Sequence, residues 1–206
     1  MKTAARLALR FAVPLLVAGA AQAGPVFSSG PSDITTGGYN TSGGFIVSNA
    51  FTLGAQTHLT DIVIGAAVSL GRSVASISWS LGDAFFGNSV ASGVANSFAS
   101  THLGVYSGTY DVFNLAFDIP DIDLAAGTYY LTIAGTAAGS SVFWQGTGPG
   151  ISPLARQRLD ALELGNAQRG AFTLNGSQDS TVPEPGALAL ASLGLLAAGA
   201  ARHRRR

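Results

Sequence analysis

The 206-residue chain has no cysteine. A disulfide framework, a thiol nucleophile and a thiolate metal site are therefore excluded. Basic residues are scarce in the body of the chain, because residues 24–185 hold eleven acidic but only four basic residues, a formal net charge of −7. A body this acidic should repel nucleic acid and anionic lipid, so we expect no nucleic-acid partner.

The other seven basic residues lie at the two ends of the chain. Residues 1–23 combine a basic start with the apolar run FAVPLLVAGA and the small residues Ala21 and Ala23. This pattern is typical of a secretory signal peptide that signal peptidase removes after Ala23. The alternative is an N-terminal membrane anchor, but the apolar run has about half of the ~20 residues that a spanning helix needs. We therefore predict export across the inner membrane.

The C-terminus, VPEPGALALASLGLLAAGAARHRRR, has three parts. Pro183, Glu184 and Pro185 come first, and the two prolines favour extended backbone and keep a helix from growing into the motif. Residues 186–201 carry no charge and predict a membrane helix of ~24 Å, which can span the ~30 Å hydrocarbon core if the following arginines snorkel. Residues 202–206 form a basic tail that favours the cytoplasmic side. Its arginines are Arg202, Arg204, Arg205 and Arg206.

This succession of Pro-Glu-Pro, apolar helix and arginine cluster resembles the PEP-CTERM sorting signal, and the resemblance is confined to residues 182–206. It implies recognition by an exosortase, a membrane enzyme of Gram-negative bacteria that is thought to cut near the motif. It also implies a protein that is anchored transiently in the inner membrane and then reaches the cell surface or the medium. Such proteins are commonly associated with exopolysaccharide and biofilm matrix. The alternative is an ordinary C-terminal anchor that is never cut.

Helical periodicity is nearly absent between Val26 and Thr181, where apolar and polar residues alternate. Ile77, Trp79 and Leu81, for example, are expected to face the core together. The clearest alternating segments are 45–53, 77–81, 111–119 and 127–135, and the weaker ones are 58–64, 102–106, 141–145 and 168–174. These patterns predict about eight strands separated by Gly- and Ser-rich turns. We expect an all-β fold, an antiparallel β-sandwich or jelly-roll-like single domain over residues 24–174.

Three segments of the body lack clear alternation. Residues 24–44 are loop-like and are expected to form a mobile arm. Residues 153–164, PLARQRLDALEL, contain helix formers, so they are interpreted either as one short helix at the sandwich edge or as a strand pair. Residues 175–182 are polar and predict a spacer between the domain and the sorting signal at 183–206.

The search for a catalytic motif is negative. His58 and His102 lack metal-ligand spacing, and the chain has no G-x-S-x-G elbow and no P-loop. A glycosidase would need two carboxylates across a cleft, and no such pair stands out. We therefore predict no catalytic residue, no enzyme activity and no cofactor, with a hydrolase as the least favoured alternative.

An acidic cluster gives a weak hypothesis of a metal site. Asp118, Asp121 and Asp123 lie close together, and Ca²⁺ prefers several oxygen ligands from one region. Their spacing is not that of an EF-hand loop. We favour the alternative, a solvated sheet edge whose charges discourage pairing with another strand.

Aromatic side chains give a second hypothesis, because carbohydrate modules stack sugar rings on exposed Trp or Tyr. Such residues in the body are Trp79, Trp144, Tyr106, Tyr110, Tyr129 and Tyr130. Phe143 and Trp144 are adjacent, so on a strand one faces the core and the other faces out. If Phe143 fills the core, Trp144 is exposed and becomes the candidate sugar-binding residue, whereas a buried Trp144 excludes that role.

Two functions remain for comparison with the structure. The first is an exported, exosortase-sorted, non-enzymatic protein of the cell surface or extracellular matrix. The alternative is a β-sandwich carbohydrate-binding module, with or without Ca²⁺, that binds matrix polysaccharide.

Overall fold

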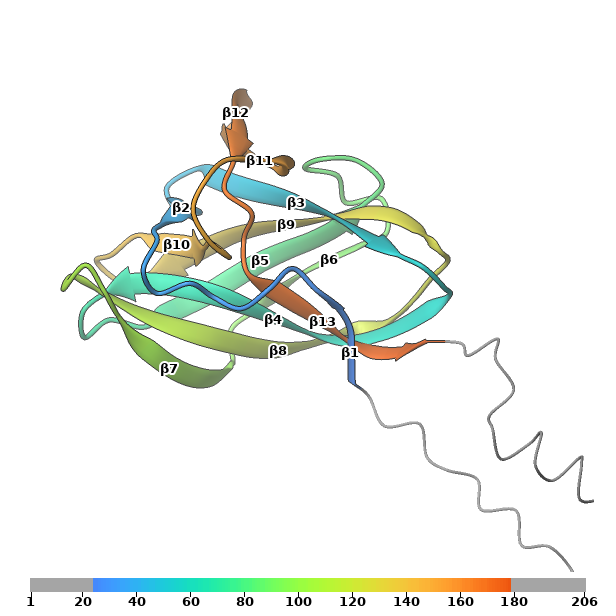
Figure 1. The fold of residues 1–206 in the computed structure, drawn as a ribbon, viewed down its shortest axis with the longest axis horizontal. Helices are drawn as coiled ribbons and strands as arrows, with labels where there is room; N and C mark the ends of the chain where they lie inside the picture. The colour runs from blue at the N-terminus through green and yellow to red at the C-terminus, as the bar shows by residue number, and fades with distance from the viewer. Residues whose placement is uncertain (1–23, 179–206) are drawn as a thin grey trace, which may run out of the picture.

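The computed structural model describes residues 24–178, which form two antiparallel sheets around one hydrophobic core (Figure 1). The all-β prediction is therefore confirmed, with thirteen strands where about eight were expected. Residues 24–178 contain no helix long and apolar enough to cross a membrane. The predicted signal peptide with Ala21 and Ala23, the end of the spacer, and the sorting signal with its Pro-Glu-Pro, helix and arginines lie outside the described residues.

The first sheet is built on its two longest strands, β4 (Thr57–Ser69) and β8 (Tyr110–Leu124), which pair from end to end. On its other side β4 pairs first with β13 (Phe172–Gln178) and then with β10 (Val142–Gln145). The remaining strands lie outside these four. They are β1 (Gly24–Ser28) next to β13, β2 (Gly38–Asn40) next to β10, and β7 (Ala99–Tyr106) next to β8.

The second sheet has the order β12-β11-β3-β9-β5-β6. Its strands are β3 (Phe45–Leu53), β5 (Val74–Gly82), β6 (Ala91–Ala95), β9 (Gly127–Ala137), β11 (Ser152–Leu159) and β12 (Leu162–Ala167). Strands β11 and β12 form a hairpin that projects at the top of Figure 1. Of the two interpretations of residues 153–164, the strand pair is confirmed and the helix is wrong.

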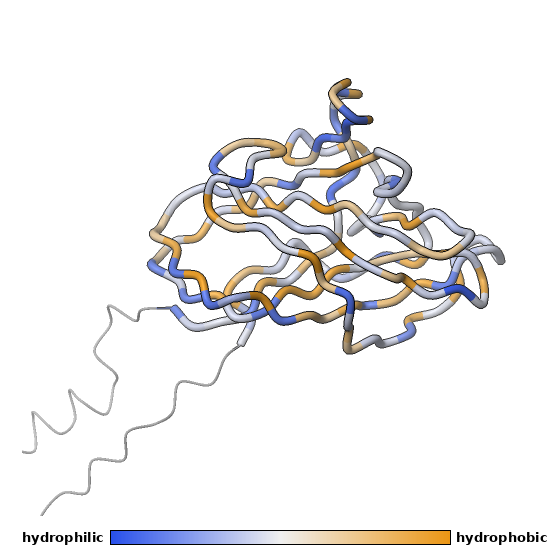
Figure 2. Tube along the Cα trace, turned by 180° about the vertical axis from the view of Figure 1, so that it is seen from behind, coloured by the Kyte–Doolittle hydropathy of each residue, from blue (hydrophilic) through white to orange (hydrophobic). Residues whose placement is uncertain are grey.

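The core lies between the sheets and contains the residues that alternation assigned to it. Ile77, Trp79 and Leu81 are all buried, as are Leu131 and Ile133 on the neighbouring β9. Figure 2 shows hydrophobic and hydrophilic positions interspersed along the described chain, as expected for strands with one face on the core. Complete burial of one such aliphatic side chain contributes about 1.5–3 kcal/mol, so these strands carry much of the stability of the domain.

Residues 24–44 do not form the expected mobile arm. Strand β1 pairs with β13, β2 pairs with β10, and the Phe27 ring packs 5.4 Å from Phe51 and 5.3 Å from Phe172. The pairing partners lie more than a hundred residues away, and such short strands show no alternation of their own. Strand β13 also continues to Gln178, so the first four residues of the predicted spacer belong to the sheet.

The two ends of the described chain lie side by side. Gly24 of β1 is opposite Gly176 of β13, and both ends leave the domain on the same side (Figure 1). Strand β4 leads away from this point, because Thr57 is opposite Gln178 and Ser69 is opposite Tyr110. Its 13 residues correspond to a span of about 40 Å. The turn between β7 and β8 is therefore remote from the attachment of the C-terminal segment.

Candidate functional site

Trp144 is a core residue, so the exposed side chain that a sugar-binding role for it requires is not present. Its side chain is 2% exposed, its ring lies 5.7 Å from Phe172, and its Nε1 donates a hydrogen bond to the Ala171 carbonyl at 2.9 Å. Gly170 makes room for the indole, since a Cβ at that position would lie 2.4 Å from the ring. This neighbour is distant in sequence, so local alternation could not show which of the two aromatics faces inward. A role for Trp144 in sugar binding is excluded.

Phe143 therefore faces outward, and it meets two tyrosines there. Tyr106 ends β7 and Tyr110 begins β8, and their rings stack at 6.4 Å with an interplanar angle of 28°. The ring of Tyr110 meets that of Phe143 edge to face at 5.2 Å. All three side chains are half-buried and border a cavity of about 180 Å³, which we call the aromatic pocket. Its other lining residues are Gly37, Gly38, Ala67 and Gln145.

The segment before β2 completes the aromatic pocket. A Cβ at Gly38 would lie 2.2 Å from the Trp144 carbonyl oxygen, so glycine is required there, and a Cβ at Gly37 would crowd the Tyr106 hydroxyl at 3.2 Å. The buried Gln145 amide donates through Nε2 to the carbonyls of Asp33 and Thr36. Its Oε1 has no hydrogen-bond partner. The pocket thus combines aromatic faces with a buried acceptor that lacks a donor.

Of the six aromatic residues named from the sequence, only Tyr106 and Tyr110 meet in this pocket. Trp79 is buried in the core, Tyr129 packs against Phe51 at 5.9 Å, and Tyr130 packs against Phe85 at 4.5 Å. Phe143 was missed as an outward residue. The adjacency of Phe143 and Trp144 correctly indicates that they face opposite sides of the strand, but it does not show which of them faces the core.

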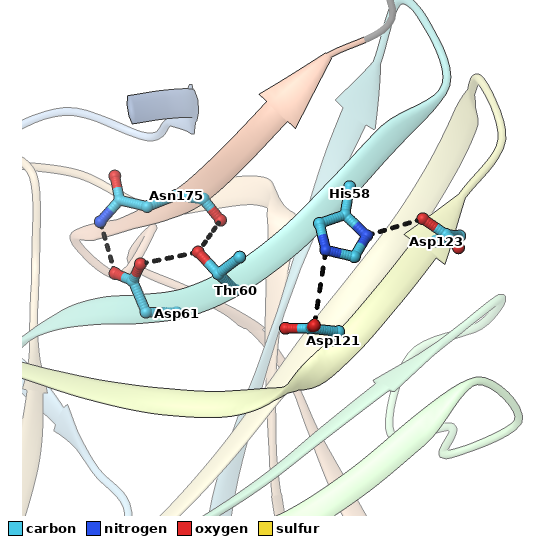
Figure 3. A network of polar contacts seen from close by, with 6 residues as sticks. All are labelled: His58, Thr60, Asp61, Asp121, Asp123 and Asn175. Carbon is cyan, nitrogen blue, oxygen red and sulfur yellow. Dashed lines mark hydrogen bonds and ion pairs between the residues drawn. The ribbon is translucent and has the colours of Figure 1, made fainter. Parts of the chain in front are cut away.

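Two of the three clustered aspartates, Asp121 and Asp123, lie in a polar network around His58 (Figure 3). His58 of β4 lies between two aspartates of β8, with Nδ1 2.8 Å from Asp123 Oδ1 and Nε2 3.7 Å from Asp121 Oδ2. Asp118 lies elsewhere, opposite Asp61 in register. Within residues 24–178 no three His, Asp or Glu side chains converge to hold a metal ion, so the calcium hypothesis is not supported.

A bulge separates Asp118 from the other two aspartates. From Ile122 to Asp118 strand β8 advances four residues, while the paired segment of β4 advances two, from Leu59 to Asp61. Pro120 lies in this bulge, where the missing N–H does least harm. Strand β7 pairs with β8 only as far as Ala116, so the aspartates lie where β8 has β4 as its one partner among the described strands. This agrees with the alternative of a solvated, charged sheet edge.

The pKa of His58 is shifted by its neighbours in this network. The hydrogen bond that the His58 ring donates to the Asp123 carboxylate raises the pKa of His58 above its ordinary value, and the charges of Asp123 and Asp121 add to the effect. The folded-state pKa is therefore higher than the unfolded-state pKa. The stabilisation by this pair is fully present below about pH 6.5 and is lost as the pH rises through the folded-state pKa.

We expect Asp123→Asn to lower the pKa of His58 toward its ordinary value, as measured by an NMR titration of the full chain. The difference in unfolding free energy between wild type and Asp123→Asn should narrow as the pH rises from about 6 to 8. Asp121→Asn is the matched control and should have a smaller effect, because its carboxylate is farther from the ring at 3.7 Å. A difference that is constant over this pH range would contradict the assignment.

Comparison with known proteins identifies only the end of the chain. Residues 181–206 match the family model of the PEP-CTERM protein-sorting motif. No curated protein and no solved structure matches the chain. The match confirms the resemblance seen in the sequence, and such a motif implies an exosortase-sorted, secreted protein that reaches the cell surface. The chain therefore carries a β-sandwich domain followed by a PEP-CTERM sorting motif at its C-terminal end.

Proposed function

We propose that the chain is a non-enzymatic protein of the cell surface or extracellular matrix, and that its sandwich binds matrix polysaccharide through the aromatic pocket. The observation that carries this proposal is the grouping of Tyr106, Tyr110 and Phe143 around one cavity, beside the unpaired Oε1 of Gln145. Aromatic faces stack on the C–H faces of sugar rings. The tyrosine hydroxyls can hydrogen-bond sugar hydroxyls.

The location of the pocket supports the same function. It lies at the end of β4 that is about 40 Å from the strand end where the C-terminal segment leaves. A chain held through its C-terminus would therefore present the pocket away from the attachment point. The non-enzymatic part of the proposal rests on the sequence, which contains no recognisable catalytic motif.

The test is affinity electrophoresis of the full chain, in mild detergent, through gels that contain the extracellular polysaccharide of the cells that make it. We expect retardation of the wild type and at least about a tenfold weaker affinity for Phe143→Ala and Tyr106→Ala, roughly the loss of one stacking contact. Tyr130→Ala, an aromatic on the outer face of the other sheet, is the matched control and should bind normally. Equal retardation of wild type and both pocket variants, or no retardation of any, would overturn the proposal.

A further inference from the structure

The outer face of the second sheet holds a separate cavity of about 410 Å³, which we call the arginine pocket. Small polar side chains line much of it, and Arg158 of β11 and Phe86 of the loop 83–90 contribute charge and an aromatic face. The polar residues are Ser78, Ser80, Asn88, Ser92 and Thr132. This lining offers many hydroxyl groups and one permanent cation.

Arg158 is held in place but is not neutralised. Its guanidinium carbon lies 4.7 Å from the centre of the Phe86 ring, and its Nε is buried without a hydrogen-bond partner. Among the described residues it forms no ion pair. Arg156, two residues earlier, has the same stacked arrangement on Phe85 at 4.6 Å, but its Nη1 bonds Glu163 at 2.8 Å. Of the two arginines, only Arg156 has a carboxylate partner and only Arg158 lines the arginine pocket.

The carboxylates of Glu163, Asp83 and Asp160 form no ion pair with Arg158. Glu163 lies opposite Arg158 in the β11–β12 register, yet its side chain reaches Arg156. Asp83, in the loop above the pocket, accepts a hydrogen bond from the Ser89 hydroxyl at 2.8 Å. Asp160, two residues after Arg158, packs beside Gly44. An anion that entered the pocket would thus meet a cation without displacing an internal partner.

The loop that places Phe86 is built to stay in position. Phe86 has φ of 62°, an unfavourable value for a bulky residue, so the surrounding contacts must hold it there. Its N–H donates to Ser48 Oγ at 3.2 Å, and the Ser80 hydroxyl donates to the Gly87 carbonyl at 3.0 Å. Ser48 is itself buried, and it also accepts a hydrogen bond from the Thr132 hydroxyl at 2.9 Å. A preorganised wall lowers the entropy cost of binding.

Acidic and basic residues of the strands lie on different sheets, although they are mixed along the sequence. The strands of the first sheet carry five aspartates and no arginine, whereas those of the second carry Arg156, Arg158 and a single acid, Glu163. The aspartates are Asp61, Asp111, Asp118, Asp121 and Asp123. The net negative charge that should repel polyanions therefore belongs mainly to the first sheet. The outer face of the second sheet can accept an anion.

We infer that the arginine pocket binds the carboxylate of an acidic sugar residue. The planar guanidinium of Arg158 matches a carboxylate with two parallel N–H···O bonds. The serine, threonine and asparagine side chains provide partners for the ring hydroxyls. The site lies on the opposite sheet from the aromatic pocket, so this inference does not depend on sugar binding there.

The test is calorimetric titration of the full chain with a short oligogalacturonide, beside a neutral dextran oligosaccharide and acetate. We expect the oligogalacturonide alone to bind well, and Arg158→Gln to weaken it roughly ten- to hundredfold, the loss of a charge-assisted pair. Arg158→Lys should recover part of the affinity, because it keeps the charge but not the planar fork. The double variant Arg156→Gln/Glu163→Gln is the matched control, because it leaves no freed carboxylate opposite Arg158, and it should change the affinity by less than about threefold. Thermal unfolding of each variant confirms that it is folded.

Three results would overturn the inference. Binding that survives Arg158→Gln in a folded protein would place the ligand elsewhere. Equal losses in Arg156→Gln/Glu163→Gln and in Arg158→Gln would indicate general attraction to a basic surface. Acetate or dextran that binds as well as the oligogalacturonide would show that the pocket does not recognise an acidic sugar. A Phe143→Ala chain should bind the oligogalacturonide normally. This control distinguishes binding at the arginine pocket from binding at the aromatic pocket.

Discussion

Trp144→Ala is expected to lower the free energy of unfolding by about 3–5 kcal/mol, the range for removal of a large aromatic from a packed core. The indole fills the space above Gly170, contacts Phe172, and donates a hydrogen bond to the Ala171 carbonyl. A loss of this size is a large part of the 5–15 kcal/mol that typically stabilises a domain. Trp144→Phe is a milder variant. Trp144→Phe should lower the free energy of unfolding less, because the Ala171 carbonyl still accepts a hydrogen bond from the Gly65 N–H at 2.9 Å.

Guanidinium denaturation of the full chain measures these losses. Phe143→Ala, one residue away, is the matched control and should cost less than about 1.5 kcal/mol, since its half-buried ring faces the outer surface. The pair should also separate in function, with Phe143→Ala losing polysaccharide binding and Trp144→Phe retaining it. If Phe143→Ala proved the more destabilising of the two, the orientation of this strand would be wrong.

Removal of the entire C-terminal tail is the second large effect that we expect. Protein recovered from the native cell surface or medium should lack residues 1–23 and everything beyond the Pro183-Glu184-Pro185 region, as measured by intact mass and C-terminal peptide mapping. The reason lies in the sequence, because a proline-bracketed acid before an apolar stretch gives a membrane protease an extended segment to bind. Any added mass on the new C-terminus would identify a covalent attachment.

Glu184→Ala in the native host is the most direct test of tail removal, and Glu163→Ala in the β11–β12 hairpin is its control. The first should retain the tail to Arg206, and the second should be processed as the wild type is. A wild-type chain that still ends at Arg206 would mean that the tail is a permanent anchor. The protein would then be a membrane-tethered domain, and processing by an exosortase would be excluded.

The parts of the fold that the sequence predicts are those with local patterns. Ile77, Trp79 and Leu81 alternate with serines and all lie in the core. The short strands β1 and β2 were missed because their pairing with β13 and β10 depends on contacts between distant segments. The aspartates were grouped by proximity in sequence, and the bulge near Pro120 separates them in space.

The binding surfaces were harder to predict for the same reason. The aromatic pocket joins the β7–β8 turn to β10 and to the segment before β2, and only the tertiary fold brings these together. Arg156 and Arg158 alternate with the buried Ala155 and Gln157. The helix-forming composition of that stretch obscured the strand period. The sequence therefore did not show that the two arginines lie together on the outer face of one strand.

The antiparallel pairing of β13 with β4 has a mechanical consequence. A load between a surface attachment beyond Gln178 and a ligand at the far end of β4 pulls these two strands in opposite directions along their length. Their hydrogen bonds run across that direction, so the seven residue pairs of this ladder would resist together in shear and would not peel apart one at a time. Strand β1, whose N-terminal extension should be removed on export, carries none of this tension. The domain is thus oriented to resist a pulling force between its C-terminal attachment and a ligand bound at the far end of β4.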